Sequence, residues 1–154
     1  MQKSSRLAIL ALLELASNPD RQISTAEIGE KYRVSAHHLA KVLLVLGRAG
    51  WVQSVRGVGG GYKFSGNARR ITLYDVISLF EETEVKCRLS DPSQANPEEW
   101  ALFDVSKEIN DISVATYSSI TLSTMLMQIE KRKKAQKISG SDAASDAGAK
   151  VSAQ

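Results

Sequence analysis

The sequence is poor in cysteine, histidine and proline, and it has no long apolar run. Of its 154 residues, one is cysteine, two are histidine and three are proline. A single cysteine excludes a disulfide within the chain and fits a reducing compartment. The apolar runs fall far short of the roughly 18 residues that a membrane span needs. The N-terminus also lacks the small-residue cleavage pattern of a signal peptide. We therefore expect a cytoplasmic protein without a membrane partner.

Residues suited to catalysis are equally scarce. His37 and His38 are adjacent in one predicted helix, Cys87 lies in a predicted loop, and no nucleophile motif is present. Adjacent residues on a helix point about 100° apart, so the two histidines make a poor metal chelate. We predict that the protein is not an enzyme and that the histidines hold no metal.

The net charge of +3 is unevenly distributed along the chain. Residues 1–75 carry eleven Lys and Arg against five Asp and Glu, whereas residues 76–127 carry three against nine. A basic first half followed by an acidic middle suggests that the first half meets a polyanion. A solvated surface with unevenly placed charges explains the same pattern.

Three helices are predicted in the first 50 residues. The first spans 4–17, and the second begins after Ser24, which has the capping-box spacing with Glu27. The third begins after the N-cap Ser35 and ends near Gly50. Its expected core face is Leu39, Val42, Leu43 and Leu46. A short turn joins the second and third helices, which is the outline of a helix-turn-helix.

The stretch "VRGVGGGY", residues 55–62, holds four glycines between two strand-like segments. It is not a nucleotide-binding loop, because Tyr62 and Lys63 replace the Lys-Ser/Thr ending of a Walker motif and no helix start follows. The dinucleotide pattern also fails, since Tyr62 falls where the third glycine belongs. The stretch is therefore the tip of a β-hairpin directly after a helix-turn-helix, which is the arrangement of a winged helix.

In a winged helix, the start of the second helix of the pair approaches base edges and the wing contacts the adjacent backbone or groove. Each cation at these places has the alternative role of a solvated surface charge. The predicted DNA-binding residues are Lys3, Arg6, Ala36, His37, His38, Lys41, Arg48, Arg56, Gly57, Gly59, Gly60 and Tyr62, with Ala40, Arg69 and Arg70 beside them.

The second half of the chain is predicted to contain three more helices. One is predicted within "ITLYDVISLFEE", from the cap Thr72 to Glu82, a long one follows Asn96 and Pro97, and the last is capped by Thr121. In the long helix an apolar seam repeats at 3-4-3 spacing, which suits either a dimer partner or packing on its own domain. The seam consists of Leu102, Val105, Ile109 and Ile112.

The expected fold class is mainly α with a small β-hairpin. We predict a winged helix-turn-helix DNA-binding domain over residues 1–83 and a sensor-type loop with Cys87 over 84–96. Dimerisation helices are expected over 97–134. From about Ala135 the chain has almost nothing apolar to bury, so a disordered tail is expected over 135–154.

The segment from "ISTAEIGEKYRVSAHHLAKVLLVLGRAGWV" through "RGVGGGYKFS" to "ITLYDVISLFEE" resembles the Rrf-two family of bacterial winged-helix transcription factors. The resemblance spans roughly residues 1–130, and its most distinctive motif is the wing "RGVGGGY". It implies a homodimer crossed through the long helix at about 97–118. Each recognition helix and wing would then read one half of a palindromic operator.

The chain departs from the cluster-binding members of that family, which carry three closely spaced cysteines before the dimer helix. Only Cys87 is present, "RLSDPSQANPEEWALFD" adds neither cysteine nor histidine, and Arg6 stands where some members place an acidic ligand. No cofactor is expected. The remaining route to an iron-sulfur cluster is two Cys87 side chains across a dimer, assisted by carboxylates.

Two roles remain open for Cys87. Lys86 and Arg88 flank the thiol and would favour its thiolate, which suits a redox or electrophile sensor. Alternatively the cysteine is incidental, and an external effector or a protein partner controls the regulator.

Taken with the resemblance, the sequence predicts a homodimeric, sequence-specific DNA-binding repressor. The alternative is a protein-interaction module that kept the winged-helix fold, lost DNA binding and acts through its acidic dimer arm.

Overall fold

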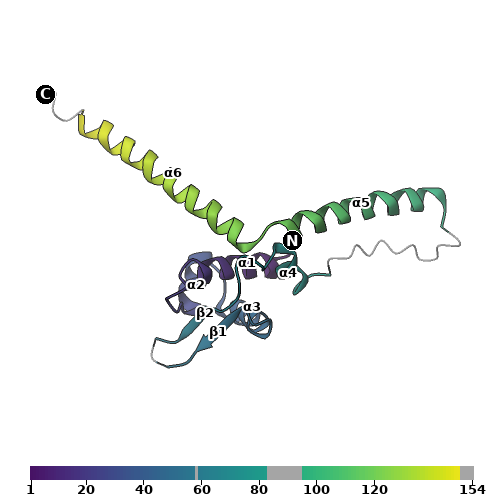
Figure 1. Ribbon diagram of the computed structural model, residues 1–154, viewed down its shortest axis with the longest axis horizontal. Helices are drawn as coiled ribbons and strands as arrows, with labels where there is room; N and C mark the ends of the chain where they lie inside the picture. The colour runs from purple at the N-terminus through teal and green to yellow at the C-terminus, as the bar shows by residue number, and fades with distance from the viewer. Residues whose placement is uncertain (58, 83–94, 150–154) are drawn as a thin grey trace.

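The computed structural model describes residues 1–57, 59–82 and 95–149, with side chains described up to Lys137. The helices and the hairpin near the N-terminus form a compact unit, from which the last two helices extend in different directions (Figure 1). The elements in chain order are α1 (Lys3–Ala16), α2 (Thr25–Tyr32), α3 (Ala36–Arg48), β1 (Val52–Val55), β2 (Gly61–Phe64), α4 (Leu73–Ser78), α5 (Pro97–Ser119) and α6 (Leu122–Ala149).

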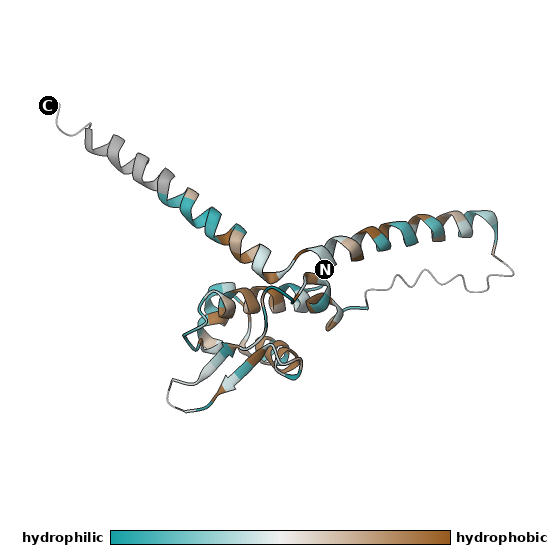
Figure 2. Ribbon diagram, in the orientation of Figure 1, coloured by the Kyte–Doolittle hydropathy of each residue, from teal (hydrophilic) through white to brown (hydrophobic). Residues whose placement is uncertain are grey.

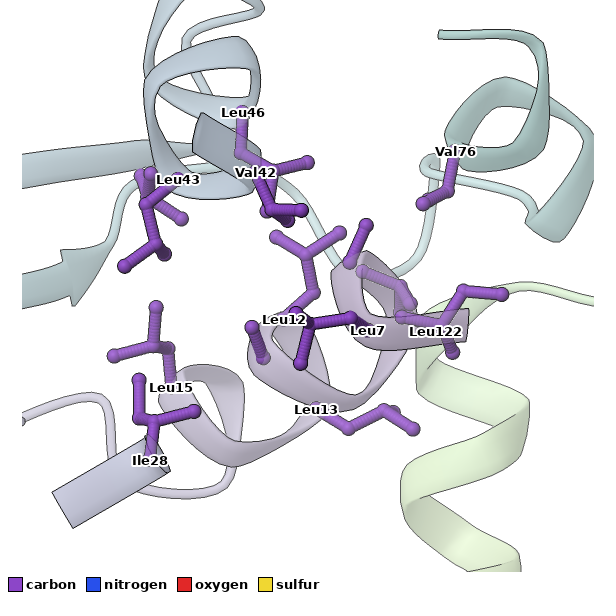
Figure 3. Packing of buried hydrophobic residues seen from close by; sticks show 14 of the residues in the cluster. Leu7, Leu12, Leu13, Leu15, Ile28, Val42, Leu43, Leu46, Val76 and Leu122 are labelled. Carbon is purple, nitrogen blue, oxygen red and sulfur yellow. The ribbon is translucent and has the colours of Figure 1, made fainter. Parts of the chain in front are cut away.

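Helix α1 lies at the centre of the hydrophobic core and contacts α3, α4, β2 and α6. Leu12 and Leu15 of α1 are fully buried, as are Leu43 and Leu46 of α3, and Figure 3 shows these side chains converging between the helices. Each such leucine stabilises the fold by about 1.5–3 kcal/mol relative to an exposed one. The predicted core face of α3 is confirmed, since Leu39 and Val42 are buried with them.

The helix-turn-helix is set by local caps. The Ser24 hydroxyl accepts from the Glu27 amide at 3.2 Å, while the Glu27 carboxylate accepts from the Ser24 amide at 2.9 Å, so the predicted capping box is present. Helix α2 ends at Arg33, whose φ of 53° is left-handed. Ser35 then caps α3 by accepting from the His38 amide. These caps fix where α3 begins relative to α2.

The hairpin pairs β1 and β2 antiparallel, with Val52 opposite Phe64 and Val55 opposite Gly61. Its base is joined to the loop before α2, because Ile23 and Tyr62 exchange both backbone hydrogen bonds at 3.0 and 2.9 Å. A Cβ on Gly61 would lie 2.5 Å from the Ile23 carbonyl oxygen, so this close approach requires glycine. The wing is therefore fixed to the helix-turn-helix at its base.

The junction between α5 and α6 anchors both helices on the compact unit. Thr72, which caps α4, forms an antiparallel bridge with Thr121, the predicted cap of α6. The Thr121 hydroxyl accepts from the Thr124 amide at 3.2 Å, and Leu122 is fully buried.

Among the described residues, none of the helices has the length and apolar character needed to cross a membrane.

Two predicted boundaries differ from the structure. Helix α4 ends at Ser78, whereas the sequence suggested helix to Glu82. Helix α6 continues to Ala149, although a disordered tail was predicted from Ala135. The lack of apolar residues shows that this segment has little to bury, which by itself does not decide the conformation of its backbone.

Candidate nucleic-acid interface

Helix α3 exposes a face opposite its buried leucines. Ala36, His37, Ala40, Lys41 and Arg48 are all exposed on it. Because core packing holds the other face, these side chains project from a rigid support. The predicted reading residues are therefore brought together on one surface, except His38, which is half-buried at the start of the helix.

The wing presents a second exposed, cationic element. Arg56, Gly57 and Gly59 are exposed at its tip. Gly57 and Gly59 have φ values of 117° and 77°, a backbone that side chains rarely allow, and Gly60 has no room for a Cβ because the Val55 carbonyl oxygen would lie 2.7 Å away. The glycines make a tight turn next to the exposed Arg56.

Tyr62 has a different place from the other wing residues. Its ring is half-buried against the core, and both its backbone groups bond Ile23. The structure therefore makes Tyr62 part of the base of the wing, and contact of its exposed portion with DNA stays a prediction. Arg69 and Arg70, just beyond the wing, are exposed.

Lys3 and Arg6 lie on the first turns of α1, close to the start of α3. Together with His38 they line one cavity, so the structure brings these three predicted residues together. Lys3 and Arg6 are exposed, and neither forms an ion pair among the described residues. This edge of the molecule therefore adds unpaired positive charge to the surface formed by α3 and the wing.

Sequence reasoning missed three residues of this surface. Leu44 is 55% exposed on α3. Its helical position, outside the buried face of Leu39, Val42, Leu43 and Leu46, already predicts this exposure. Arg33 is exposed in the turn before α3 and was overlooked as a turn residue. Gln22 donates from Nε2 to the Gly59 carbonyl oxygen at 2.8 Å and braces the wing tip, a contact that no local pattern predicts.

The predicted dimerisation residues are exposed along α5. Leu102, Val105, Ile109 and Ile112 have exposed fractions of 64, 55, 60 and 60%, and Figure 2 shows apolar residues recurring along this projecting helix. Among the described residues, the seam is therefore not covered by packing on its own domain, which was the alternative to a dimer partner.

The sensor prediction for Cys87 lies outside the described residues, as do Lys86 and Arg88. In the described part of the chain, no cluster of three or more His, Cys, Asp or Glu side chains is placed to hold a metal ion. With one cysteine in the whole sequence and both histidines at the start of α3, the donor set of one chain does not fit an iron-sulfur cluster, which takes four ligands.

A helix-turn-helix followed by a braced, glycine-rich wing, with cations exposed on both, defines a winged-helix DNA-binding regulator of transcription. Residues 1–128 match the model of the Rrf2 family, described as "Iron-dependent Transcriptional regulator", and the chain belongs to this family. The resemblance inferred from the wing and the helix-turn-helix is thus confirmed.

Individual relatives agree with this assignment. BadM of Rhodopseudomonas palustris, named as an HTH-type transcriptional regulator, is 44% identical over 134 residues, which cover 87% of this chain and 85% of BadM. IscR of Cereibacter sphaeroides is 34% identical over 86 residues, covering 54% of this chain and 56% of IscR. These names favour a DNA-binding regulator over an interaction module that no longer binds DNA.

Solved structures confirm the fold. CymR of B. subtilis superposes with a TM-score of 0.68 at 24% identity, covering 83% of this chain and 96% of CymR. IscR of T. potens superposes with a TM-score of 0.64 at 26% identity, covering 86% of this chain and 89% of IscR.

Proposed function

We propose that the protein is a homodimeric repressor that binds a palindromic operator. The observation that carries the proposal is that Lys41 and Arg48 lie exposed on α3 and Arg56 lies exposed on the wing that follows it. Major-groove contacts from α3 would read bases, and the wing and the start of α1 would hold phosphates.

The dimer is supported by the unused apolar seam of α5. Side chains such as Ile109 and Ile112 are 60% exposed in one chain, and covering them with the same seam of a second copy removes that area from water. A two-fold dimer then presents two reading surfaces related by symmetry, which is the arrangement that a palindromic site requires.

We propose repression rather than activation because a dimer bound at a promoter excludes other proteins from that DNA and needs no further protein contact to do so. We propose that the protein does this without a bound cluster, with Cys87 or an external effector as the signal. Iron and sulfide analysis of protein purified without oxygen tests the cluster, because stoichiometric iron would contradict this part.

Footprinting on the DNA upstream of its own gene tests the operator. We expect two symmetric protected half-sites whose centres are separated by about 10 base pairs or a multiple of that. Titration at concentrations well above the dissociation constant should saturate at two chains per site. A single unsymmetric footprint bound by one chain would contradict the dimeric arrangement, and no protection on any fragment would contradict operator binding.

A further inference from the structure

A cavity of about 490 Å³ lies between the start of α1 and the turn that joins α2 to α3. This volume is within the range of small-molecule sites, about 300–1,000 Å³. The neighbouring surface is proposed to contact DNA bases and phosphates, and those contacts do not require a cavity of this size. The cavity is lined by Lys3, Arg6, Leu7, Leu10, Tyr32, Arg33, Val34, Ser35 and His38.

The charged lining of the cavity has one sign. Lys3, Arg6 and Arg33 contribute cations, and none of the described lining residues is acidic. None of the three forms an ion pair within the described part of the chain. Their positive charge is therefore available to a ligand.

The carboxylate that contacts the lining residue Tyr32 is already engaged elsewhere. Glu14 pairs with Lys31 and accepts from the Tyr32 hydroxyl at 3.0 Å. Burial, together with the Glu14 charge and this hydrogen bond, raises the pKa of Tyr32 to about 12, so the phenol stays neutral and keeps the proton that it donates to the Glu14 carboxylate. The charge of Glu14 is thus paired with Lys31, and Tyr32 adds no negative charge to the lining.

Beside the polar Ser35 and His38, part of the remaining lining is apolar. Leu7 is 3% exposed, and Leu10 and Val34 are half-buried beside it. A bare phosphate would use the cations but would leave this apolar wall without a partner. An organic anion with an aliphatic or aromatic body would use both, because carboxylate pairs with the cations while its body buries apolar surface.

We propose that this cavity binds a small amphipathic organic anion, which acts as an effector of DNA binding. Lys3, Arg6 and His38 line the cavity and also belong to the predicted DNA surface, so a bound anion offsets charge that would otherwise meet phosphates. This regulatory part rests on the proposed function. Occupancy is expected to weaken operator binding and to make it less sensitive to salt.

The ligand site is tested first without DNA, by calorimetric titration of the full chain with octanoate and, separately, with inorganic phosphate at equal ionic strength. We expect octanoate to bind once per chain and phosphate to show no comparable affinity. Phosphate binding as tightly as octanoate would overturn the proposal, because the site would then be a simple anion site.

Two lining variants locate the ligand. Arg33→Asn removes one cation from the cavity, and asparagine tolerates the left-handed backbone at this position. Leu10→Gln replaces an apolar lining side chain with a polar one. Loss of a charge-assisted contact should weaken octanoate binding by roughly tenfold or more. Arg132→Gln, an exposed cation on α6 outside the cavity, is the matched control and should bind octanoate as the parent does. Unchanged affinity in both folded lining variants would place octanoate elsewhere and overturn the site.

The regulatory part is tested by measuring operator affinity with and without saturating octanoate. Weaker binding in the parent, with little change in Arg33→Asn, supports it. Operator binding that octanoate leaves unchanged overturns the inference while the proposed function stands. Octanoate binding by a protein that retains no operator affinity would instead leave the ligand site in place and contradict the proposed function.

Discussion

At the scale of single residues, exposed cations on a rigid support carry the DNA-binding account. Lys41 lies on the face of α3 opposite Leu43 and Leu46, and Arg56 stands at the wing beside glycines with positive φ. Neither side chain forms a hydrogen bond or an ion pair with another described residue. Each can therefore be replaced without leaving a buried group unpaired.

We expect Lys41→Ala and Arg56→Ala each to weaken operator binding. A lost phosphate contact lowers the salt slope by about 1, and a lost base contact costs about 1–3 kcal/mol and relaxes specificity at one position. Fluorescence anisotropy with a labelled operator measures both effects, and thermal unfolding should stay as in the parent. Arg132→Ala removes the same charge from α6, which points away from the wing in Figure 1, and is the control. If both variants bind like the control, the reading surface has been placed wrongly.

At the scale of elements, the joints between segments decide how the surface is held. Gly61 of β2 is one such joint, where a Cβ would lie 2.5 Å from the Ile23 carbonyl oxygen. Gly47 of α3 offers a matched comparison, because the nearest atom to its Cβ, the Val52 carbonyl oxygen, would be at an ordinary 3.8 Å.

The same substitution should therefore have opposite effects at the two glycines. Gly61→Ala should lower the free energy of unfolding by about 1–3 kcal/mol through overpacking, whereas Gly47→Ala should raise it by about 0.5–1 kcal/mol because alanine favours helix. Urea unfolding of both variants measures this. Equal stability of Gly61→Ala and the parent would show that the Ile23–Tyr62 bridge does not hold the wing.

A second joint ties the segment after α4 to the start of α1. The Glu81 carboxylate accepts from the Ser5 hydroxyl and the Gln2 amide and lies 3.9 Å from the N-terminal ammonium. Burial alone would raise the pKa of Glu81, but the Ser5 and Gln2 hydrogen bonds and the ammonium charge outweigh it and lower the pKa from its usual 4.5.

Because the pKa of Glu81 is lowered in the folded protein, its stabilising effect is present above pH 4.5 and is lost as the pH falls through the folded value. Glu81→Gln should therefore be less stable at neutral pH and should lose less stability than the parent on acidification below pH 4.5. Denaturant unfolding across this range measures the difference, with Glu30→Gln on the exposed surface of α2 as the control. If the free energy of unfolding falls equally with pH in the parent and in Glu81→Gln, the Glu81 contacts do not stabilise the folded protein.

The elements predicted correctly from the sequence are those fixed by short-range chemistry. The Ser24–Glu27 box and the Ser35 cap act within three residues, so helix starts were readable. The hydrogen bond between Gln22 and Gly59 joins residues that are 37 positions apart, and the bond between Gln2 and Glu81 joins residues that are 79 apart. No local sequence pattern predicts either contact. The end of α6 was missed because composition reports burial rather than backbone conformation.

At the scale of the whole molecule, the projecting helix α5 carries an apolar seam that no other described part of the chain covers. A charge placed in the seam should separate a dimer that buries it. We expect Ile109→Glu to sediment as a monomer at concentrations where the parent is a dimer, and to bind the operator at least tenfold more weakly, because two linked reading surfaces become one. Ser118→Glu adds the same charge away from the seam and is the control. A dimeric Ile109→Glu variant would place the subunit interface elsewhere.

The central claim is that the surface formed by α3, the wing and the start of α1 binds DNA. The measurement that tests it most directly is the affinity of the full chain for its own upstream DNA and for a scrambled fragment, at salt concentrations from about 50 to 200 mM. The account predicts preference for the upstream fragment and an affinity that falls steeply with salt, because several cations meet phosphates. Equal binding of both fragments, or an affinity unaffected by salt, would contradict it.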